Sequence, residues 1–131
     1  MRSFARAGRL GQVYPAPFDV HLPSGDIVQP DLIFVAVRNA HIVKDWIFGI
    51  PDLLVEVVSQ ESPERDRIVK RDLYARNGVP EYWLVQDDPP GIEVFRHAKG
   101  RYFPAGCFPE TEIATSPMFP GLTLPVREML A

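Results

Sequence analysis

The chain has a single cysteine, Cys107, and only three histidines, which lie far apart at His21, His41 and His97. One cysteine excludes an internal disulfide bond and a cysteine-based zinc cluster, and the histidines show no ligand spacing. We therefore expect that any metal ion in this protein is held by oxygen ligands.

The sequence also lacks a long apolar run and a strong net charge. No apolar run approaches the roughly 20 residues that span a bilayer. The basic start MRSFARAGRLGQV has no apolar core of the kind found in a signal peptide. These absences predict a cytoplasmic protein with no membrane segment. The net charge of −3 gives no global electrostatic reason to bind nucleic acid.

Length and composition predict one compact domain over residues 1–131. Of these residues, 46% are hydrophobic and 24% are charged, as in a globular protein. Basic residues gather near the start and again between residues 65 and 76, where acidic residues dilute them. A solvated helix face is one reading of the second group. A nucleic-acid-binding module that uses Arg65, Arg67 and Arg71 is another.

The apolar runs before residue 60 predict strands. The segments QVYPAPFDVHL and DIVQPDLIFVAV are separated by the turn-forming cluster PSG, which indicates a hairpin. Pro15, Pro17 and Pro30 favour pairing at a sheet edge or at bulges. PDLLVEVVS is apolar on both alternating faces, which is typical of a strand covered on both sides. We expect it to be the central strand.

The second half of the chain predicts a helix followed by three more strands. The helix runs roughly from Pro63 to Asn77, with Ser62 as its N-cap and Asn77-Gly78 as its stop signal. EYWLVQ then predicts a strand, GIEVFRHAKGRYFPAG a hairpin that turns at AKG, and LPVREMLA a short final helix. The order β-β-β-α-β-β-β indicates an α/β or α+β domain with a mixed sheet.

Glu56 is the conspicuous residue, because it stands inside the apolar run LLVEVV. A buried carboxylate is costly unless it is paired or bound to a cation. Strand alternation puts Glu56 on one face with Asp52, Leu54 and Val58. A glutamate at a sheet margin, or one paired with an arginine, would explain it without any function.

Asp31 raises the same question at the start of an apolar strand. An aspartate after a proline often only supports a turn. If its strand neighbours that of Glu56, however, the two carboxylates could converge into an oxygen-rich site, which Mg²⁺ prefers. Asp52 is a poorer partner for Glu56, because four residues of extended strand separate them by about 13 Å.

Lys70 is the third candidate, on the predicted helix. It borders the stripe of Val69 and Leu73 that we expect to face the sheet, so its ammonium could reach the same site. Asp66 stands four residues earlier, and an ordinary ion pair between the two on the helix surface is the simpler explanation.

Five features occur in order along nearly the whole chain: VQPDLIFV, GIPDLLVEVVS, the spacing from Asp66 to Lys70, LYARNGVPEYWLV and FPGLTLPVREML. Together they resemble the Uma-type family of predicted restriction endonucleases, in the PD-(D/E)XK superfamily. The resemblance implies a restriction-endonuclease-like core, with a mixed sheet flanked by helices. It also implies a magnesium-dependent site that hydrolyses phosphodiester bonds of DNA.

Carried over by position, Pro30-Asp31 matches the PD motif, and Glu56 is the acidic element 25 positions later. On this reading Asp31, Glu56 and the backbone carbonyl of Val57 bind Mg²⁺ or Mn²⁺, and Asp31, Glu56 and Lys70 are catalytic. Val58 stands where the superfamily pattern has its lysine, and Lys70 takes that part from the helix.

Family members usually carry a helical segment, often with another acid, before the first hairpin, whereas this chain reaches GQVYPAPFDV almost at once. We therefore expect a member that is shortened at its N-terminus. The alternative function is an inactive remnant, or a nucleic-acid-binding or interaction domain with the same fold. A homodimer is the expected assembly, because two sites related by two-fold symmetry suit both strands of a duplex.

Overall fold

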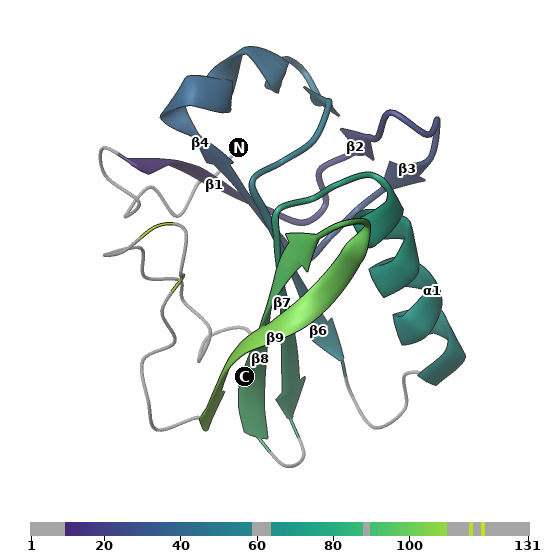
Figure 1. Ribbon diagram of the computed structural model, residues 1–131. Coiled ribbons are helices and arrows are strands. Elements are labelled where there is room, and N and C mark those ends of the chain that lie inside the picture. The colour runs from purple at the N-terminus through teal and green to yellow at the C-terminus, as the bar shows by residue number, and fades with distance from the viewer. Residues whose placement is uncertain (1–9, 59–63, 88–89, 110–115, 117–118, 120–131) are drawn as a thin grey trace.

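A computed structural model describes residues 10–58, 64–87, 90–109, 116 and 119. Six strands form one mixed sheet, and three short strands form a second sheet beside it (Figure 1). The elements are β1 (Gly11–Pro15), β2 (Val20–His21), β3 (Ile27–Val28), β4 (Leu32–Ala36), the 3-10 helix η2 (Val37–Ile42), β5 (Ile47–Phe48), β6 (Leu53–Val58), α1 (Glu64–Arg76), β7 (Glu81–Asp87), β8 (Pro90–Ala98) and β9 (Arg101–Pro109).

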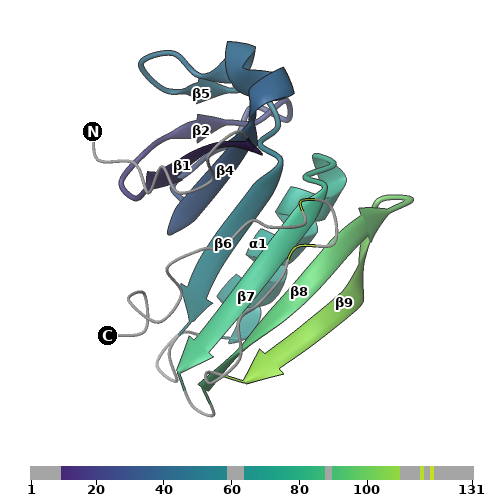
Figure 2. The ribbon, with the colours of Figure 1, turned by 90° about the vertical axis from the view of Figure 1, so that its left-hand side faces the viewer.

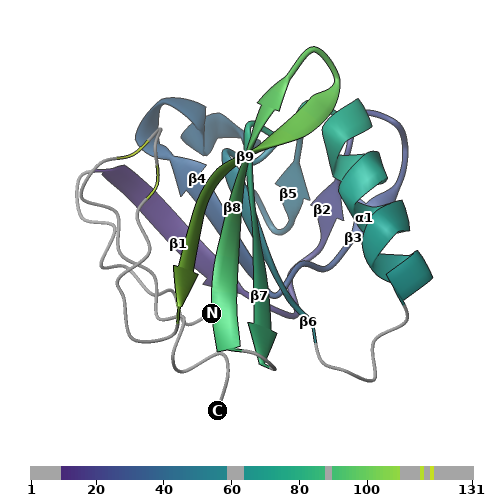
Figure 3. The same cartoon turned by 60° about the horizontal axis from the view of Figure 1, so that its bottom comes forward.

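The large sheet has the strand order β1-β4-β6-β7-β8-β9. Its one parallel pair is β6 and β7, and α1 connects these two strands as a crossover along one face of the sheet (Figures 2 and 3). The neighbouring pairs in this sheet are antiparallel. The predicted mixed sheet and the α+β class are confirmed, and β6 is central as expected.

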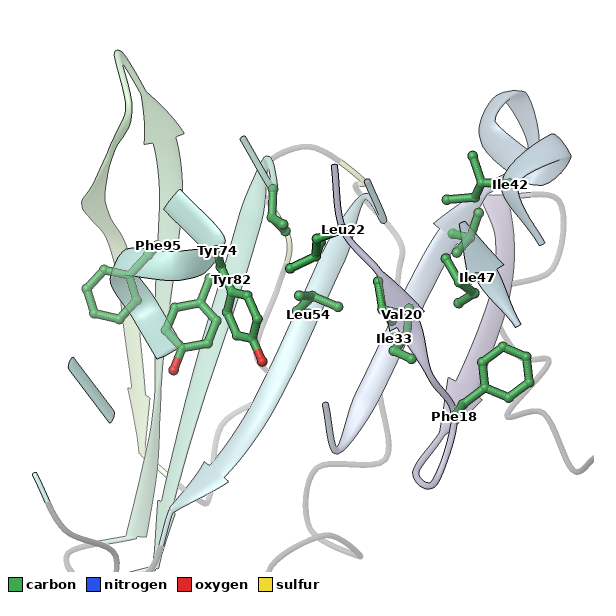
Figure 4. Packing of buried hydrophobic residues seen from close by; sticks show 12 residues of the cluster. Phe18, Val20, Leu22, Ile33, Ile42, Ile47, Leu54, Tyr74, Tyr82 and Phe95 are labelled. Carbon is green, nitrogen blue, oxygen red and sulfur yellow. The ribbon is translucent and has the colours of Figure 1, made fainter. Parts of the chain in front are cut away.

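Apolar side chains cover both faces of β6, which is why apolar residues occupy both its odd-numbered and its even-numbered positions. Leu53 and Val55 join a cluster on one face that includes Phe34, Trp83 and Phe119. On the other face, Leu54 joins a second cluster, which extends from α1 to the small sheet (Figure 4). Glu56 lies on this second face, at the end toward α1.

Two of the predicted turns are confirmed. Gly78 has a positive φ of 78° just after α1, and the Val79 N–H donates to the Tyr74 carbonyl at 3.1 Å, as in a helix that stops at glycine. Lys99 and Gly100 both have positive φ, of 52° and 77°, and join β8 to β9. Two consecutive residues of this kind make the turn that suits a twisted hairpin.

The first predicted hairpin is divided into two pairings. β2 pairs with β3 around the PSG turn, while β1 pairs with β4 and lies at the sheet edge, as Pro15 indicated. Val37, which ends the predicted strand segment DIVQPDLIFVAV, begins η2 instead, and the sequence predicts no element for residues 38–48, where the rest of η2 and β5 lie. The predicted N-cap Ser62 and the final helix lie outside the described residues.

The inward-facing stripe predicted for α1 is confirmed for Leu73, which packs against the second cluster, and is wrong for Val69. Val69 is 57% exposed, whereas Tyr74 and Ala75 are buried against the sheet. The larger apolar surface of Tyr74 decides which side of the helix packs inward, because burial of an aromatic ring dominates the packing of a short helix.

Candidate active site

Asp31 lies just before β4 and beside the end of β6. The two strands are aligned with Leu32 opposite Val55, so the residue before Leu32 comes next to Glu56. The backbone N–H of Val57 donates to Asp31 Oδ2 at 2.7 Å. This hydrogen bond holds the Asp31 carboxylate at the edge of β6.

Glu56 is 4% exposed and has two partners on α1. The Tyr74 hydroxyl donates to Glu56 Oε2 at 2.5 Å. Lys70 Nζ lies 3.8 Å from the same oxygen. Because residues four apart lie on one face of a helix, Lys70 and Tyr74 reach the same carboxylate. Figure 4 shows Tyr74 packed between α1 and the sheet, next to Tyr82.

The pKa of Glu56 is raised from its ordinary value to about 7. Burial is the main cause, since desolvation disfavours the charged form. The hydrogen bond from Tyr74 and the ammonium of Lys70 act in the opposite direction, while the charge and a hydrogen bond of Asp31 raise the pKa further. Asp31 is therefore close enough to Glu56 to act on its charge.

These groups line a cavity of about 420 Å³ between the sheet and α1. Its walls include Asp31, Glu56, Val57 and Lys70. The side chain of Lys70 is 52% exposed, so the ammonium stands at the mouth while the glutamate lies at the bottom. Arg67 also lines this cavity, and its Nε is buried without a hydrogen-bond acceptor among the described residues.

The structure thus brings together Asp31, Glu56 and Lys70, which the sequence analysis proposed from separate segments. In the described part of the chain, the ion pair recorded for Lys70 is with Glu56, and the simpler pair with Asp66 is not formed. Asp52 lies apart from this site. It accepts a hydrogen bond from the Ala36 N–H at 2.7 Å.

Sequence reasoning missed Tyr74. Its signal was present, because Tyr74 follows Lys70 by four residues and must therefore share its helix face. A tyrosine inside a short polar helix was easily taken as ordinary packing.

The donor set suits a hard divalent cation. The Val57 N–H engages one oxygen of Asp31. Tyr74 and Lys70 engage one oxygen of Glu56. The two carboxyl groups also contact each other, so their oxygens gather in one place. The N–H and C=O of one strand residue point to the same side, so the Val57 carbonyl faces the Asp31 side as well. The described residues hold no cluster of three acidic, histidine or cysteine ligands. Mg²⁺ accepts such a sparse set, because it usually keeps several waters.

Comparison with solved structures gives the class of fold. The chain is similar to a crystal structure of "a putative nuclease belonging to DUF820" from Anabaena variabilis ATCC 29413, with a TM-score of 0.66 and 15% sequence identity. The match covers 93% of this chain and 69% of that chain. The fold is therefore that of this nuclease neighbour.

The family follows from the sequence itself. Residues 1–127 match the model of the family described as "Uma2: Putative restriction endonuclease", and the chain belongs to this family. No curated protein matches the sequence. Among the described residues, no helix is long and apolar enough to cross a membrane.

Proposed function

We propose that this protein is a divalent-metal-dependent endonuclease that hydrolyses phosphodiester bonds of DNA. The observation that carries the proposal is the meeting of Asp31, Glu56 and Lys70 in one cavity, where burial raises the pKa of Glu56 to about 7 and the nearby Asp31 raises it further. Perturbed carboxyl groups of this kind concentrate at functional sites. Family membership and the nuclease neighbour support the same reaction class.

Asp31, Glu56 and the Val57 carbonyl would hold Mg²⁺, or Mn²⁺ in its place. Such a cation supplies Lewis-acid polarisation of the phosphodiester and a lowered pKa for a bound water. The chain itself positions the ligands: the Val57 N–H orients Asp31, and Tyr74 orients Glu56. Lys70, at the mouth of the cavity, would neutralise negative charge that grows on the phosphoryl oxygens when water attacks phosphorus and the P–O bond breaks.

The test is a nuclease assay with Mg²⁺ or Mn²⁺ on single- and double-stranded DNA and on RNA, beside Glu56→Gln. We expect cleavage of DNA by the wild type only. Metal binding without cleavage of any substrate would instead favour the inactive remnant. Duplex cleavage also suits a homodimer, which light scattering of the purified protein measures directly.

A further inference from the structure

A second and larger hollow lies beside the proposed active site. It measures about 780 Å³ and is bounded by the C-terminal half of α1 and by the hairpin of β8 and β9. The turn of this hairpin lies by the C-terminal end of α1 (Figures 1 and 3). We call this hollow the hairpin cleft.

The hairpin cleft is basic in a protein of net negative charge. Its described walls contain three arginines, Arg71, Arg76 and Arg101, against one acid, Asp72. All three arginines are exposed, and the Arg71–Asp72 ion pair is long, at 3.9 Å between Nε and Oδ1. An exposed pair at this distance contributes little. The Arg76 Nε donates a long hydrogen bond to the Asp72 carbonyl, at 3.4 Å, which leaves the terminal nitrogens of that guanidinium group to face an anion.

The walls of the hairpin cleft are held in place by contacts between the hairpin and the end of α1. A ring nitrogen of His97 lies 3.0 Å from the Ala75 carbonyl oxygen. The Tyr102 hydroxyl donates to the Val79 carbonyl at 2.9 Å. A binding surface that is already formed loses little conformational entropy on association.

The hairpin cleft is connected to the active-site cavity along α1. Val69 lines both hollows. A smaller hollow of about 120 Å³ shares Arg71 with the cleft and shares Arg67 and Tyr82 with the active-site cavity. Arg67, whose Nε lacks an acceptor among the described residues, therefore stands between the two. A row of guanidinium groups runs from the catalytic carboxylates to the hairpin.

The chemistry of the cleft suits phosphates and not bases. Phe95 is buried, and Tyr102 is stacked on Tyr82 with 5.5 Å between ring centroids. Tyr102 also meets the His97 ring edge to face, with 6.0 Å between centroids. The Phe95 and Tyr102 rings are therefore both engaged in packing within the protein, and neither is an exposed platform for nucleobases. Arginines without such a platform bind the backbone in any sequence context.

We infer that the hairpin cleft binds the phosphodiester backbone of the substrate strand some nucleotides away from the scissile bond, through Arg71, Arg76 and Arg101. The inference rests on the proposed function in taking the substrate to be a nucleic acid. It assigns the direction in which the strand leaves the active site, along α1 toward the β8–β9 turn. Binding there is independent of sequence and of a divalent cation.

The test measures binding separately from cleavage. Fluorescence anisotropy with a labelled random-sequence DNA oligonucleotide, single-stranded and as a duplex, is recorded in EDTA over a range of salt concentrations. The double variant Arg76→Gln, Arg101→Gln is compared with the control Lys44→Gln, Arg96→Gln. The control removes the same charge from exposed positions that line neither hollow. Circular dichroism checks that both variants are folded.

The association constant falls as salt rises, so a plot of log K against log salt concentration has a negative slope. We expect this slope to be less steep in the cleft variant, by about 1.4 for a single strand and about 1.8 for a duplex, since two phosphate contacts are lost. Affinity near 0.1 M salt, one decade below 1 M, should fall about twenty-five-fold for a single strand and about sixtyfold for a duplex. The control should match the wild type. Equal losses in both variants, or no salt-dependent binding by the wild type, would overturn the inference.

The outcomes also separate the inference from the proposed function. If the wild type cleaves DNA with Mg²⁺ and the cleft variant binds as the control does, the cleft is excluded and the nuclease stands. If the cleft variant alone loses binding and no protein cleaves, the cleft is supported and the nuclease fails.

Discussion

The replacement Glu56→Gln tests the electrostatics of the site most directly. It preserves the shape of the side chain and an oxygen that accepts the Tyr74 hydrogen bond, but it removes the charge. The wild-type carboxyl has a pKa raised from 4.5 to about 7 by burial. The folded state therefore binds this proton more tightly than the unfolded state does.

The sign of the effect follows from this difference. The stabilising contribution of protonated Glu56 is fully present below about pH 4.5 and is lost as the pH rises through about 7. One pKa unit corresponds to about 1.4 kcal/mol, so a rise from pH 5 to pH 8 should cost the wild type about 2–3 kcal/mol in the absence of metal. Glutamine does not titrate, so the variant should lack this loss.

The measurement is urea unfolding of both proteins in EDTA at several pH values. The free energy of unfolding of Glu56→Gln, minus that of the wild type, should increase by about 2–3 kcal/mol between pH 5 and pH 8. Glu93→Gln is the matched control. Glu93 lies on β8 and Glu56 on β6, each opposite Leu84 of β7. A Glu56→Gln difference that stays constant with pH would refute the assignment of a buried, proton-binding carboxyl.

Four further outcomes are expected. Mg²⁺ or Mn²⁺ should raise the melting temperature of the wild type, and Glu56→Gln should abolish that shift; a retained shift would place the metal elsewhere. Lys70→Met should keep the shift yet lower the cleavage rate about a hundredfold or more, and equal rates would remove Lys70 from the site. Tyr74→Phe, which leaves Glu56 without its donor, should cost about 1–3 kcal/mol of unfolding free energy at pH 8 in EDTA, whereas an unchanged midpoint would contradict its role. Asp31→Asn should move the pH transition of Glu56 to lower pH, because the Asp31 charge raises that pKa; an unmoved transition in the same urea series would argue against the coupling.

Much of the fold was predictable because its signals are local. The apolar run of β6 indicated a strand covered on both faces, and Asn77-Gly78 and Lys99-Gly100 indicated where the backbone turns. Positive φ at a glycine or in a hairpin turn is decided by a few neighbouring residues. The division of the first hairpin into two pairings was not predictable in the same way, because it depends on contacts with β4 and β5.

The sequence by itself also marked Asp31 and Glu56, since an acid in or beside an apolar strand is costly wherever that strand packs. Their proximity is decided by the register between β4 and β6, which no local pattern contains. The turning of α1 is likewise a tertiary result, because Tyr74 buries more surface than Val69 and brings Lys70 to Glu56. The hairpin cleft was the least predictable feature from sequence. Arg76 lies on α1 and Arg101 on β9, and only packing brings these two elements together.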